Sequence, residues 1–393
     1  MALVTYVLGD CPSCKAQNTF GNVDVYGNSV YKGCKRCRYS EHIDLPPLRK
    51  KVLYLDQFFF SHAFRGSDVR FVAAAERIAR LASLQLLAAP FSSIHEDETH
   101  QWEKRDALLK FIKATARGHE FEPAYEVEQT QMVESFQLWL AAKPTEYALD
   151  PTDAVEDDVH HWDSYMRIDV GRYTGDIELI RDLKKQSIEG LVNLFEGWRK
   201  LRTPFEEDLQ AEYHVAGKAY LDFYLEFASR VTRGDYMAMF DAPIISQVVQ
   251  TMLHVIPGDA TQEQKLHKCA EFLVSDHFKE VPYQWLNAHM LATLKLLVKN
   301  GAYANRDRAL QKLSGLFYDV KHIATYAPYV DAFVMDQPMA DLVSRPTVRL
   351  EERYGTKVFS LNNWDDFLGW LGQLEREMSA DHREGLRLAY PCT

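Results

Sequence analysis

Short apolar runs near both ends of the chain predict buried parallel strands. One run, Val52–Leu55, is followed by Asp56; another, Ala332–Met335, is followed by Asp336; a third covers 357–360. Continuous β-branched and aromatic runs of this length are typical of strands that are buried on both faces of a parallel sheet. Because the carboxyl ends of parallel strands meet at one edge of an open α/β sheet, Asp56 and Asp336 are expected to lie close together.

The long segments between these runs have helical periodicity. Helices are predicted at 67–87, 94–116, 262–278 and 364–378. From about 118 to 300 the chain is almost wholly helical and lacks the alternation of strand and helix that builds a parallel sheet. We therefore expect an α/β domain over 51–378, with a doubly wound parallel sheet and a large helical insertion at about 118–300. Residues 379–393 have the character of a loose tail.

Two further segments are predicted to lack regular secondary structure. Pro46-Pro47 predicts a linker, because proline can continue neither a helix nor a central strand. The acidic stretch 146–169 predicts an irregular loop, either solvated or acting as a lid over a site.

Residues 1–46 form a separate unit that is predicted to bind zinc. Its two CxxC pairs are separated by nineteen residues, 15–33, within which apolar and polar residues alternate around Gly and Asn turns as in a β-hairpin. This spacing matches a tetrahedral structural zinc site, and four thiolates leave no open position for catalysis. The unit resembles a small β zinc ribbon. The four predicted ligands are Cys11, Cys14, Cys34 and Cys37.

The charge of the chain is unevenly distributed. The formal net charge is −11, but residues 1–51 carry eight Lys/Arg against four Asp/Glu. The acidic total argues against a protein that coats nucleic acid, whereas a basic head is compatible with holding a polyanion at one end. A zinc ribbon can bind nucleic acid or protein, or can simply stabilise a fold, and the spacing does not decide between these roles.

Acidic residues also occur early in two predicted helices. Asp319 begins the stretch 319–324, and Glu96, Asp97 and Glu98 follow Ile94. If Ile94 packs inward, Glu98 shares its face of the helix, so we favour Glu98 and keep Glu96 as the alternative. Carboxylates brought together in this way repel one another, and a divalent cation would keep them ionised. A metal-dependent phosphodiester hydrolase is the function that this set suggests.

Three neighbours of the acidic set have open roles. Asp331 precedes its strand, and it is a candidate for a supporting position beside the ligands. His95 and His322 lie within one helical turn of Glu98 and Asp319. Either histidine could orient a carboxylate or contact phosphate, or could be a satisfied structural residue.

The order of these acids resembles that of a PIN-like nuclease domain. The resemblance rests on Leu55-Asp56-Gln57, on the stretch 92–99, on 319–324 and on 331–336, and it covers about 51–116 and 301–376. It implies a metal-dependent ribonuclease that holds one or two Mg²⁺ or Mn²⁺ ions. The ligands and catalytic residues that it implies are Asp56, Glu98, Asp319 and Asp336.

The expected function is therefore endonucleolytic cleavage of RNA, and the resemblance suggests a toxin-like or antiviral defence effector that a protein inhibitor could restrain. Two alternatives stay open: a structure-specific DNA nuclease with the same carboxylates, and a non-catalytic adaptor whose ribbon binds nucleic acid or protein. The first residues lack the basic start and long apolar core of a secretory signal. No apolar run is long enough to span a bilayer, so a cytoplasmic protein without a membrane partner is expected.

Overall fold

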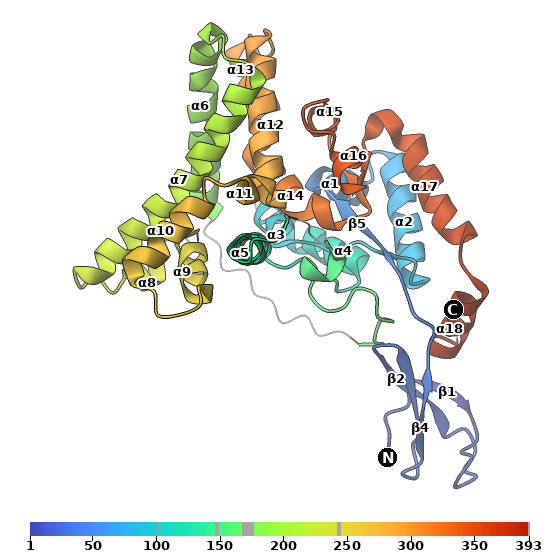
Figure 1. Cartoon of the computed structure of the whole chain (residues 1–393). Coiled ribbons are helices and arrows are strands. Elements are labelled where there is room, and N and C mark those ends of the chain that lie inside the picture. Colours follow the sequence, from blue (N-terminus) through green and yellow to red (C-terminus); the bar gives the residue numbers. More distant parts are fainter. Residues whose placement is uncertain (101, 146–148, 167–176, 242–244, 392–393) are drawn as a thin grey trace.

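A computed structural model describes residues 1–100, 102–145, 149–166, 177–241 and 245–391. It contains two four-stranded sheets (Figure 1). The N-terminal sheet is antiparallel and consists of β1 (Tyr6–Gly9), β2 (Phe20–Tyr26), β3 (Ser29–Cys34) and β4 (Ser40–Asp44). The second sheet is parallel, with the order β6-β5-β7-β8, and consists of β5 (Lys51–Leu55), β6 (Leu87–Ala88), β7 (Ala332–Val334) and β8 (Lys357–Phe359). The predicted mixed α/β architecture with a small N-terminal β unit is confirmed at this level.

The centre of the parallel sheet joins the two ends of the chain. Leu53 of β5 pairs with Ala332 of β7, and Leu55 pairs with Val334. Both strands are almost wholly buried, which explains their continuous apolar sequence. The carboxyl ends of these strands lie at the same edge of the sheet. Asp56 and Asp336, which follow the two strands, therefore lie at that edge, as the sequence predicts.

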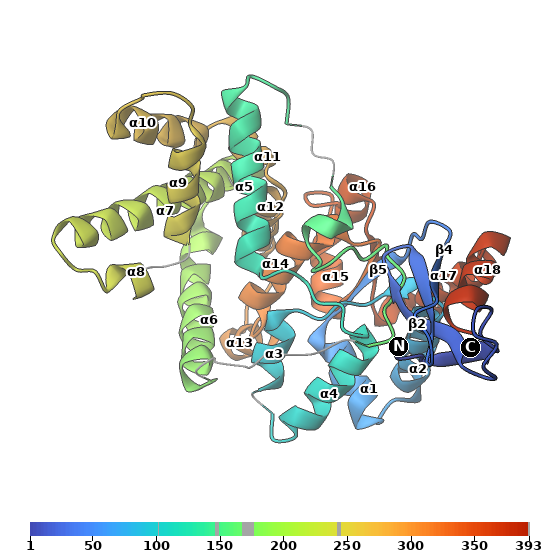
Figure 2. The same cartoon turned by 90° about the horizontal axis from the view of Figure 1, so that it is seen from below.

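Helices cover both faces of this sheet because successive side chains of a strand point to opposite faces. Figure 2 shows helices on both sides of β5. Leu53 and Leu55 pack in a core with the helices on one side, whereas Val52 and Tyr54 pack in a core with the helices on the other side. The first group is α1 (Gln57–Arg65), α2 (Val69–Ser83), α4 (Arg105–Ala116) and α17 (Trp364–Arg376). The second group includes α5 (Ala124–Leu140), α12 (Pro282–Lys299), α14 (Leu316–Tyr326) and α15 (Gln337–Val343).

The helical middle of the chain has a core of its own. The helices of this part are α6 (Ile177–Lys200), α7 (Phe205–Thr232), α8 (Ala238–Asp241), α9 (Ile245–Val255), α10 (Gln262–Phe272), α11 (Asp276–Glu280) and α13 (Arg306–Lys312). The separate core contains α7, α9, α10 and α11, whereas α6 and α13 pack in the sheet core. Helix α12 joins this part to the sheet domain: Leu286 and Met290 pack in the sheet core, while Ala288 and Ala292 pack in the separate helical core. The insertion is therefore anchored to the sheet domain by α12, which has two apolar faces, and also by α6 and α13.

Several element boundaries differ from the sequence prediction. The helix predicted at 262–278 is two helices, because the Ser275 hydroxyl caps a new helix by accepting a hydrogen bond from the Phe278 amide at 3.3 Å. The helix predicted at 94–116 divides into α3 (Ser93–Thr99) and α4. Short elements complete the chain: α16 (Leu350–Tyr354), α18 (Ala380–Ala389), and 3₁₀ turns at Pro151–Asp153, Ala327–Tyr329 and Leu361–Asn363.

The expected loose tail is instead a helix that packs against the N-terminal sheet. Leu386 and Ala389 of α18 share a core with Val25 and Val30 of the sheet. The Asn22 side-chain amide donates to the carbonyl of Leu388 at 2.8 Å. The C-terminal helix α18 therefore lies next to the N-terminal sheet (Figure 1), and the N-terminal unit is attached to the body by packing as well as by its linker.

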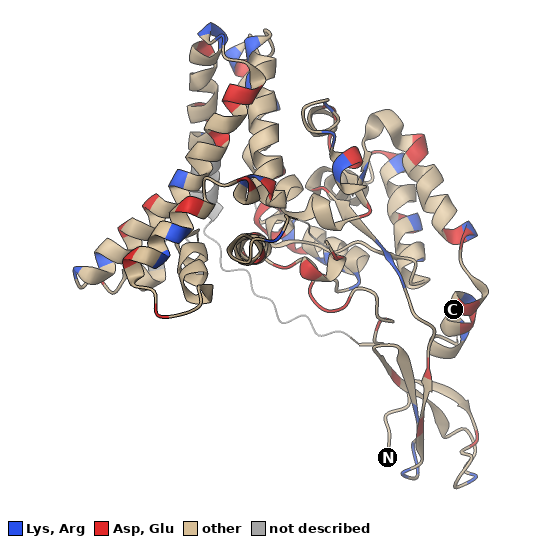
Figure 3. Ribbon diagram, in the orientation of Figure 1, with Lys and Arg blue, Asp and Glu red and all other residues tan. Residues whose placement is uncertain are grey.

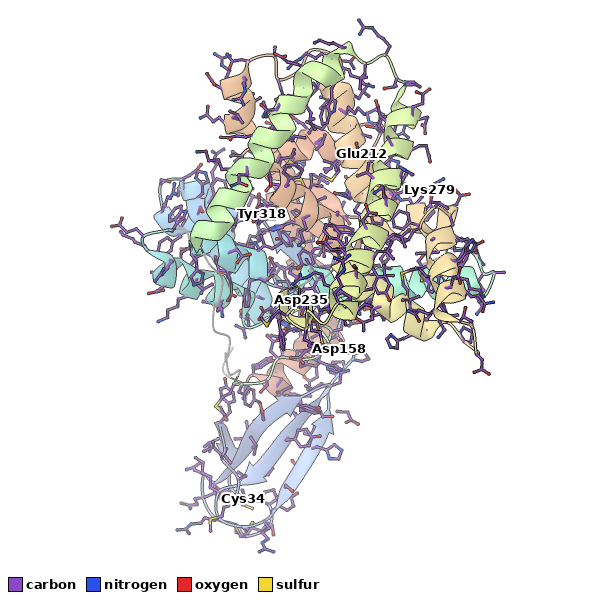
Figure 4. All side chains as sticks on the ribbon, turned by 90° about the vertical axis from the view of Figure 1, so that its left-hand side faces the viewer. Cys34, Asp158, Glu212, Asp235, Lys279 and Tyr318 are labelled. Carbon is purple, nitrogen blue, oxygen red and sulfur yellow. The ribbon has the colours of Figure 1, made fainter. Side chains whose placement is uncertain are left out.

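The described part of the acidic segment, 149–166, also lies against the N-terminal sheet and its linker. Trp162 donates from Nε1 to the Pro46 carbonyl at 2.9 Å, and the Asp163 carboxylate contacts the buried Lys50 amine at 2.5 Å. Lys50 precedes β5, at the end opposite Asp56, and Figure 4 shows Asp158 where the ribbon meets the body. This part of the segment is therefore no lid over Asp56; residues 146–148 and 167–169 lie outside the described residues.

A buried ionic network holds this junction. Burial alone would raise the pKa of Asp163, but the hydrogen bond with His119 and the charge of Lys50 hold that pKa well below its ordinary value. Gln85 donates to the same carboxylate at 3.0 Å. Since a charge buried without these partners would be costly, the network specifies how residues from four distant segments meet.

We predict that Trp162→Ala destabilises the whole protein. The indole is 2% exposed, and loss of a buried Trp side chain typically costs about 3–5 kcal/mol. Urea unfolding measures the change, with Tyr26→Ala as the control because its ring is 77% exposed in the same region. Equal stability of the two variants would contradict the proposed role of Trp162 at the junction.

Candidate metal centres

The four predicted zinc ligands converge at one point. The sulfur atoms of Cys11 and Cys37 are 3.7 Å apart, those of Cys14 and Cys34 are 3.8 Å apart, and all four lie within 4.8 Å of one another. A tetrahedron with zinc–sulfur bonds of about 2.3 Å has edges of roughly 3.8 Å. The pairs are also far beyond disulfide bonding distance. The cysteines are therefore positioned to bind one metal ion, which fits structural zinc.

Backbone amides around the cysteines favour the thiolate form. The amide of Arg36 donates to Cys34 Sγ at 3.3 Å, and that of Tyr39 donates to Cys37 Sγ at 3.4 Å. The hydroxyl of Thr19, with the backbone amides of Arg36 and Cys37, lowers the pKa of Cys34 to about 6 against the effect of burial. The Tyr39 amide lowers the pKa of Cys37, but burial and the other three thiols raise it to about 11. Figure 4 shows Cys34 at the end of the ribbon that is farthest from the body, so this centre is remote from the parallel sheet.

Asp56 lies at the carboxyl edge of the parallel sheet, between two other candidate acids. Its backbone amide donates to the Val334 carbonyl at 3.0 Å, and its carboxylate accepts from its neighbour Gln57 at 2.6 Å. Burial, followed by the charges of Glu98 and Asp336, raises the pKa of Asp56 to about 8. The charges of two other predicted residues, Glu98 and Asp336, therefore act on Asp56.

The acidic residues of helix α3 have different partners. Glu96 forms an ion pair with Lys113 of α4 at 3.2 Å, whereas Glu98 is the α3 acid whose charge raises the pKa of Asp56. Asp97 and Glu98 also raise the pKa of Tyr318 on α14, after burial. These contacts favour Glu98 over Glu96, and the assignment of Glu98 as a metal ligand stays a prediction.

Asp319 and Asp336 line the spaces next to Asp56. Asp56 and Asp319 face a small cavity with room for about one water, backed by apolar residues such as Met335. Asp319 and Asp336 line a neighbouring cavity of about 690 Å³. Asp336 accepts from the Met339 amide at 3.0 Å and so caps α15, and burial raises its pKa. The edge of the sheet thus presents four carboxylates from four different elements.

These carboxylates are less tightly grouped than the cysteines. Among the described residues, the cysteine quartet is the one group of three or more Cys, His, Asp or Glu whose ligand atoms gather within 4.8 Å. The larger spacing of the acids is expected for like charges without a counterion. Gly315 contributes to their placement, because a Cβ there would lie 3.0 Å from a carboxylate oxygen of Asp319.

The side chains of His95 and His322 are buried beside this edge of the sheet. His95 is fully buried; its Nδ1 accepts from the Ser92 amide at 2.9 Å, and its Nε2 lies 2.8 Å from the Leu55 carbonyl. Burial lowers the pKa of His95 to about 4, so it is neutral at physiological pH. It joins the end of β5 to the start of α3. Nδ1 of His322 lies 2.6 Å from the Tyr54 hydroxyl, and the ring borders the small cavity beside Asp56.

Asp331 lies away from the candidate site. It pairs with Lys51 at 2.6 Å and accepts from the Val52 amide at 2.8 Å, at the amino end of the strands. The supporting role considered for it beside the metal ligands is therefore wrong. Its position before β7 explains this result, because the start of one parallel strand lies next to the start of its neighbour.

No family model, curated protein or solved structure matches this chain. The resemblance to a PIN-like nuclease domain thus has no support from relatives, and the case for a function depends on the geometry of the site. In the part of the chain that the structure describes, none of the helices has both the length and the apolar character needed to cross a bilayer.

We predict about one zinc ion per chain in reduced, purified protein, because four thiolates complete a tetrahedral site. Elemental analysis measures the content. Cys34→Ser should lose the metal, whereas Cys269→Ser should retain it, since Cys269 is buried in the separate helical core. Folded, reduced protein without zinc would contradict the assignment.

We predict that Asp56→Asn stabilises zinc-loaded protein in the absence of Mg²⁺ and Mn²⁺. A carboxyl group whose pKa rises from 3.8 to about 8 on folding binds more protons when folded, so its contribution to stability falls as pH rises across that interval. One unit of pKa corresponds to about 1.4 kcal/mol, so a gain of at least about 1 kcal/mol is expected near pH 8.

Urea unfolding at about pH 5, 7 and 8 measures this effect. Asp365→Asn, at an exposed position of α17, is the control. The gain from Asp56→Asn should increase with pH, and a gain that is constant or absent over this range would show that Asp56 is not held in a repulsive environment.

Proposed function

We propose that this chain is a metal-dependent endonuclease of PIN-like type that cleaves RNA. The observation that carries the proposal is the convergence of Asp56, Glu98 and Asp336 at the carboxyl edge of the parallel sheet, where burial and mutual repulsion raise the pKa of Asp56 to about 8. Strongly perturbed carboxylates beside a cavity are typical of functional sites, and a purely structural role gives no reason to gather them.

The donor set fits a hard divalent cation. Asp56, Glu98, Asp319 and Asp336 offer only carboxylate oxygens, which Mg²⁺ and Mn²⁺ prefer, and they come from four elements that approach from different directions. A cation held by these four residues would activate a water and neutralise charge on the scissile phosphate. The zinc centre, with four thiolates at the far end of the ribbon, has a structural role in this proposal.

The protein's own groups prepare this site. The neutral His95 ties the last residue of β5 to α3 and so maintains the separation of Asp56 and Glu98. Gln57 and Met339 donate backbone hydrogen bonds to Asp56 and Asp336, which limit how these carboxylates turn. Buried Met335 and Ile323 border the small cavity and exclude bulk water from one side of the acids. A biological role as a toxin or defence effector rests on the family resemblance alone.

We predict that the full chain cleaves labelled RNA when Mg²⁺ or Mn²⁺ is added, and that Asp56→Asn lowers the rate by on the order of 100-fold or more. Metal-ion stabilisation of the transition state contributes several kcal/mol, and each 1.4 kcal/mol is about a factor of ten in rate. Gel analysis of RNA and DNA panels, single-stranded and duplex, measures cleavage by both proteins.

Asp331→Asn is a matched control, because it makes the same substitution at the opposite edge of the same sheet, and it should retain activity. Preferential cleavage of DNA would favour the alternative of a DNA nuclease. If the folded, zinc-loaded protein binds nucleic acid or a protein but cleaves nothing, it is an adaptor and the nuclease proposal is wrong.

A further inference from the structure

The larger cavity at the carboxylate edge has two chemically different walls. It has a volume of about 690 Å³ and lies between α12 and α13 on one side and α15 on the other. Its acidic lining consists of Asp319, Asp336 and Asp341. Apolar side chains such as Leu294 and Leu316 form its floor. The volume is within the range of about 300–1,000 Å³ that is common for small-ligand sites.

Three cations line the rest of this cavity. Arg308 and Lys312 lie on α13, four residues apart and therefore on one face of the helix, and Arg345 follows α15. All three side chains are exposed, and none forms an ion pair or side-chain hydrogen bond with a residue that the structure describes. Lys and Arg segments are visible at the α13 end of the helical part in Figure 3. Positive charge that is not neutralised within the protein remains available to an anionic ligand.

An aromatic ring lies between the two charged walls. Tyr303 lines the cavity from the loop between α12 and α13 and has a left-handed backbone, with φ of 57°. Its carbonyl accepts from Arg199 at 2.7 Å, and its ring packs against Phe195. Burial raises the pKa of Tyr303; the charge of Arg345 lowers this pKa, and the charges of Asp336 and Asp341 raise it. A non-glycine residue in this conformation is a strained position that surrounding contacts must maintain.

We propose that this cavity binds the nucleotide next to the scissile bond of a single-stranded nucleic acid, with its base against Tyr303 and its phosphates at Arg308, Lys312 and Arg345. The proposal rests on the nuclease function proposed above and extends it to the substrate class. Asp319 and Asp336 border the same cavity, so a strand bound there has a phosphate next to the candidate metal ligands. The helical insertion, through α13, then supplies part of the substrate-binding surface.

The shape of the cavity favours a single strand over a duplex. A base can stack on an aromatic side chain only when it is free of its own neighbours, as in single strands, loops and ends. A pocket of about 690 Å³ accepts one such nucleotide but not a stacked base pair that is continuous with a double helix. The acidic surface of the rest of the chain would repel strands that are not held by these cations.

Binding measurements test this proposal independently of cleavage. The test uses full-length, zinc-loaded protein carrying Asp56→Asn, a labelled single-stranded RNA of about ten nucleotides, and fluorescence anisotropy over a series of KCl concentrations. Adding Arg308→Ala and Lys312→Ala should weaken binding by roughly tenfold to thirtyfold at about 0.1 M salt. It should also reduce the slope of log affinity against log salt by about 1.4, because each phosphate contact with a single strand contributes about 0.7.

A second double variant, Arg233→Ala with Lys268→Ala, is the matched control. Both of these side chains are exposed on the helical part, and the change in net charge is the same. If the two double variants show the same affinity and salt slope, the cavity is not the phosphate site and the proposal is wrong.

Substitutions of Tyr303 test the aromatic contact separately, because stacking affects the affinity but not its dependence on salt. Tyr303→Leu should weaken binding by roughly fivefold to a hundredfold without changing the salt slope, whereas Tyr303→Phe should bind like the parent. If Tyr303→Leu does not fold, the comparison of Tyr303→Phe with the charge variants still tests the site. Duplex RNA or DNA that binds as tightly as single strands, with the same loss in the variants, would overturn the single-strand assignment.

The outcomes also separate this proposal from the nuclease itself. Cleavage that requires Asp56 but does not depend on Arg308 and Lys312 would retain the nuclease and reject the cavity as a subsite. Binding that depends on Tyr303, Arg308 and Lys312 in a protein that never cleaves would retain the subsite and reject the nuclease. A wild-type chain that neither binds nor cleaves single strands would reject both.

Discussion

The parallel pairing of β5 with β7 is the constraint on which the rest of the structure depends. It joins Leu53 to Ala332 and Leu55 to Val334, so the long segment between these strands must leave the sheet and return to it. The entropy of closing a segment this long is offset by its own packing: the helical part has a separate core, and α12 ties that core to the sheet. The same pairing places the residues that follow the two strands, Asp56 and Asp336, at one edge.

Several carboxylates lie at that edge, and their mutual repulsion destabilises the folded protein. Packing and hydrogen bonds around them hold them in place. The carboxylates are capped by backbone amides, and the ring of His95 fixes the angle between β5 and α3. Asp56, Glu98 and Asp336 are partly buried, which weakens the screening of their repulsion by water, so the folded protein favours a proton or a cation there. On the other side of the cavity, the cations of α13 offer a balancing charge to a ligand rather than to the acids themselves.

The N-terminal unit illustrates how a small metal-binding fold is integrated into a larger one. Its four cysteines face away from the body, while Val25 and Val30 pack against α18 and Trp162. Asp163 meets Lys50 and His119 in the buried network beside it. The four cysteines, which are positioned to bind a metal ion, and the surface that packs against the body therefore lie at opposite ends of one small sheet.

The sequence by itself determined the features that depend on local spacing. Two CxxC pairs predict the cysteine cluster, and continuous apolar runs predict β5, β7 and β8, because metal ligation and strand burial leave periodic or fixed-interval signatures. The sequence also predicted that Asp56 and Asp336 lie at one edge, since neighbouring parallel strands have their carboxyl ends at the same edge of the sheet. The order of acids suggested Asp319 and Glu98 as their companions; Asp319 lines a cavity with Asp56, and the charge of Glu98 acts on Asp56, but their role as metal ligands stays a prediction.

Only the tertiary structure decided which side chains from distant segments touch. The pairing of Glu96 with Lys113, the position of Asp331 at the amino edge and the docking of α18 on the N-terminal sheet have no local signature. The same holds for the cavity in which Tyr303 and Arg308 face Asp336. Such contacts arise from the packing of whole elements, whose directions a one-dimensional pattern of residues does not contain.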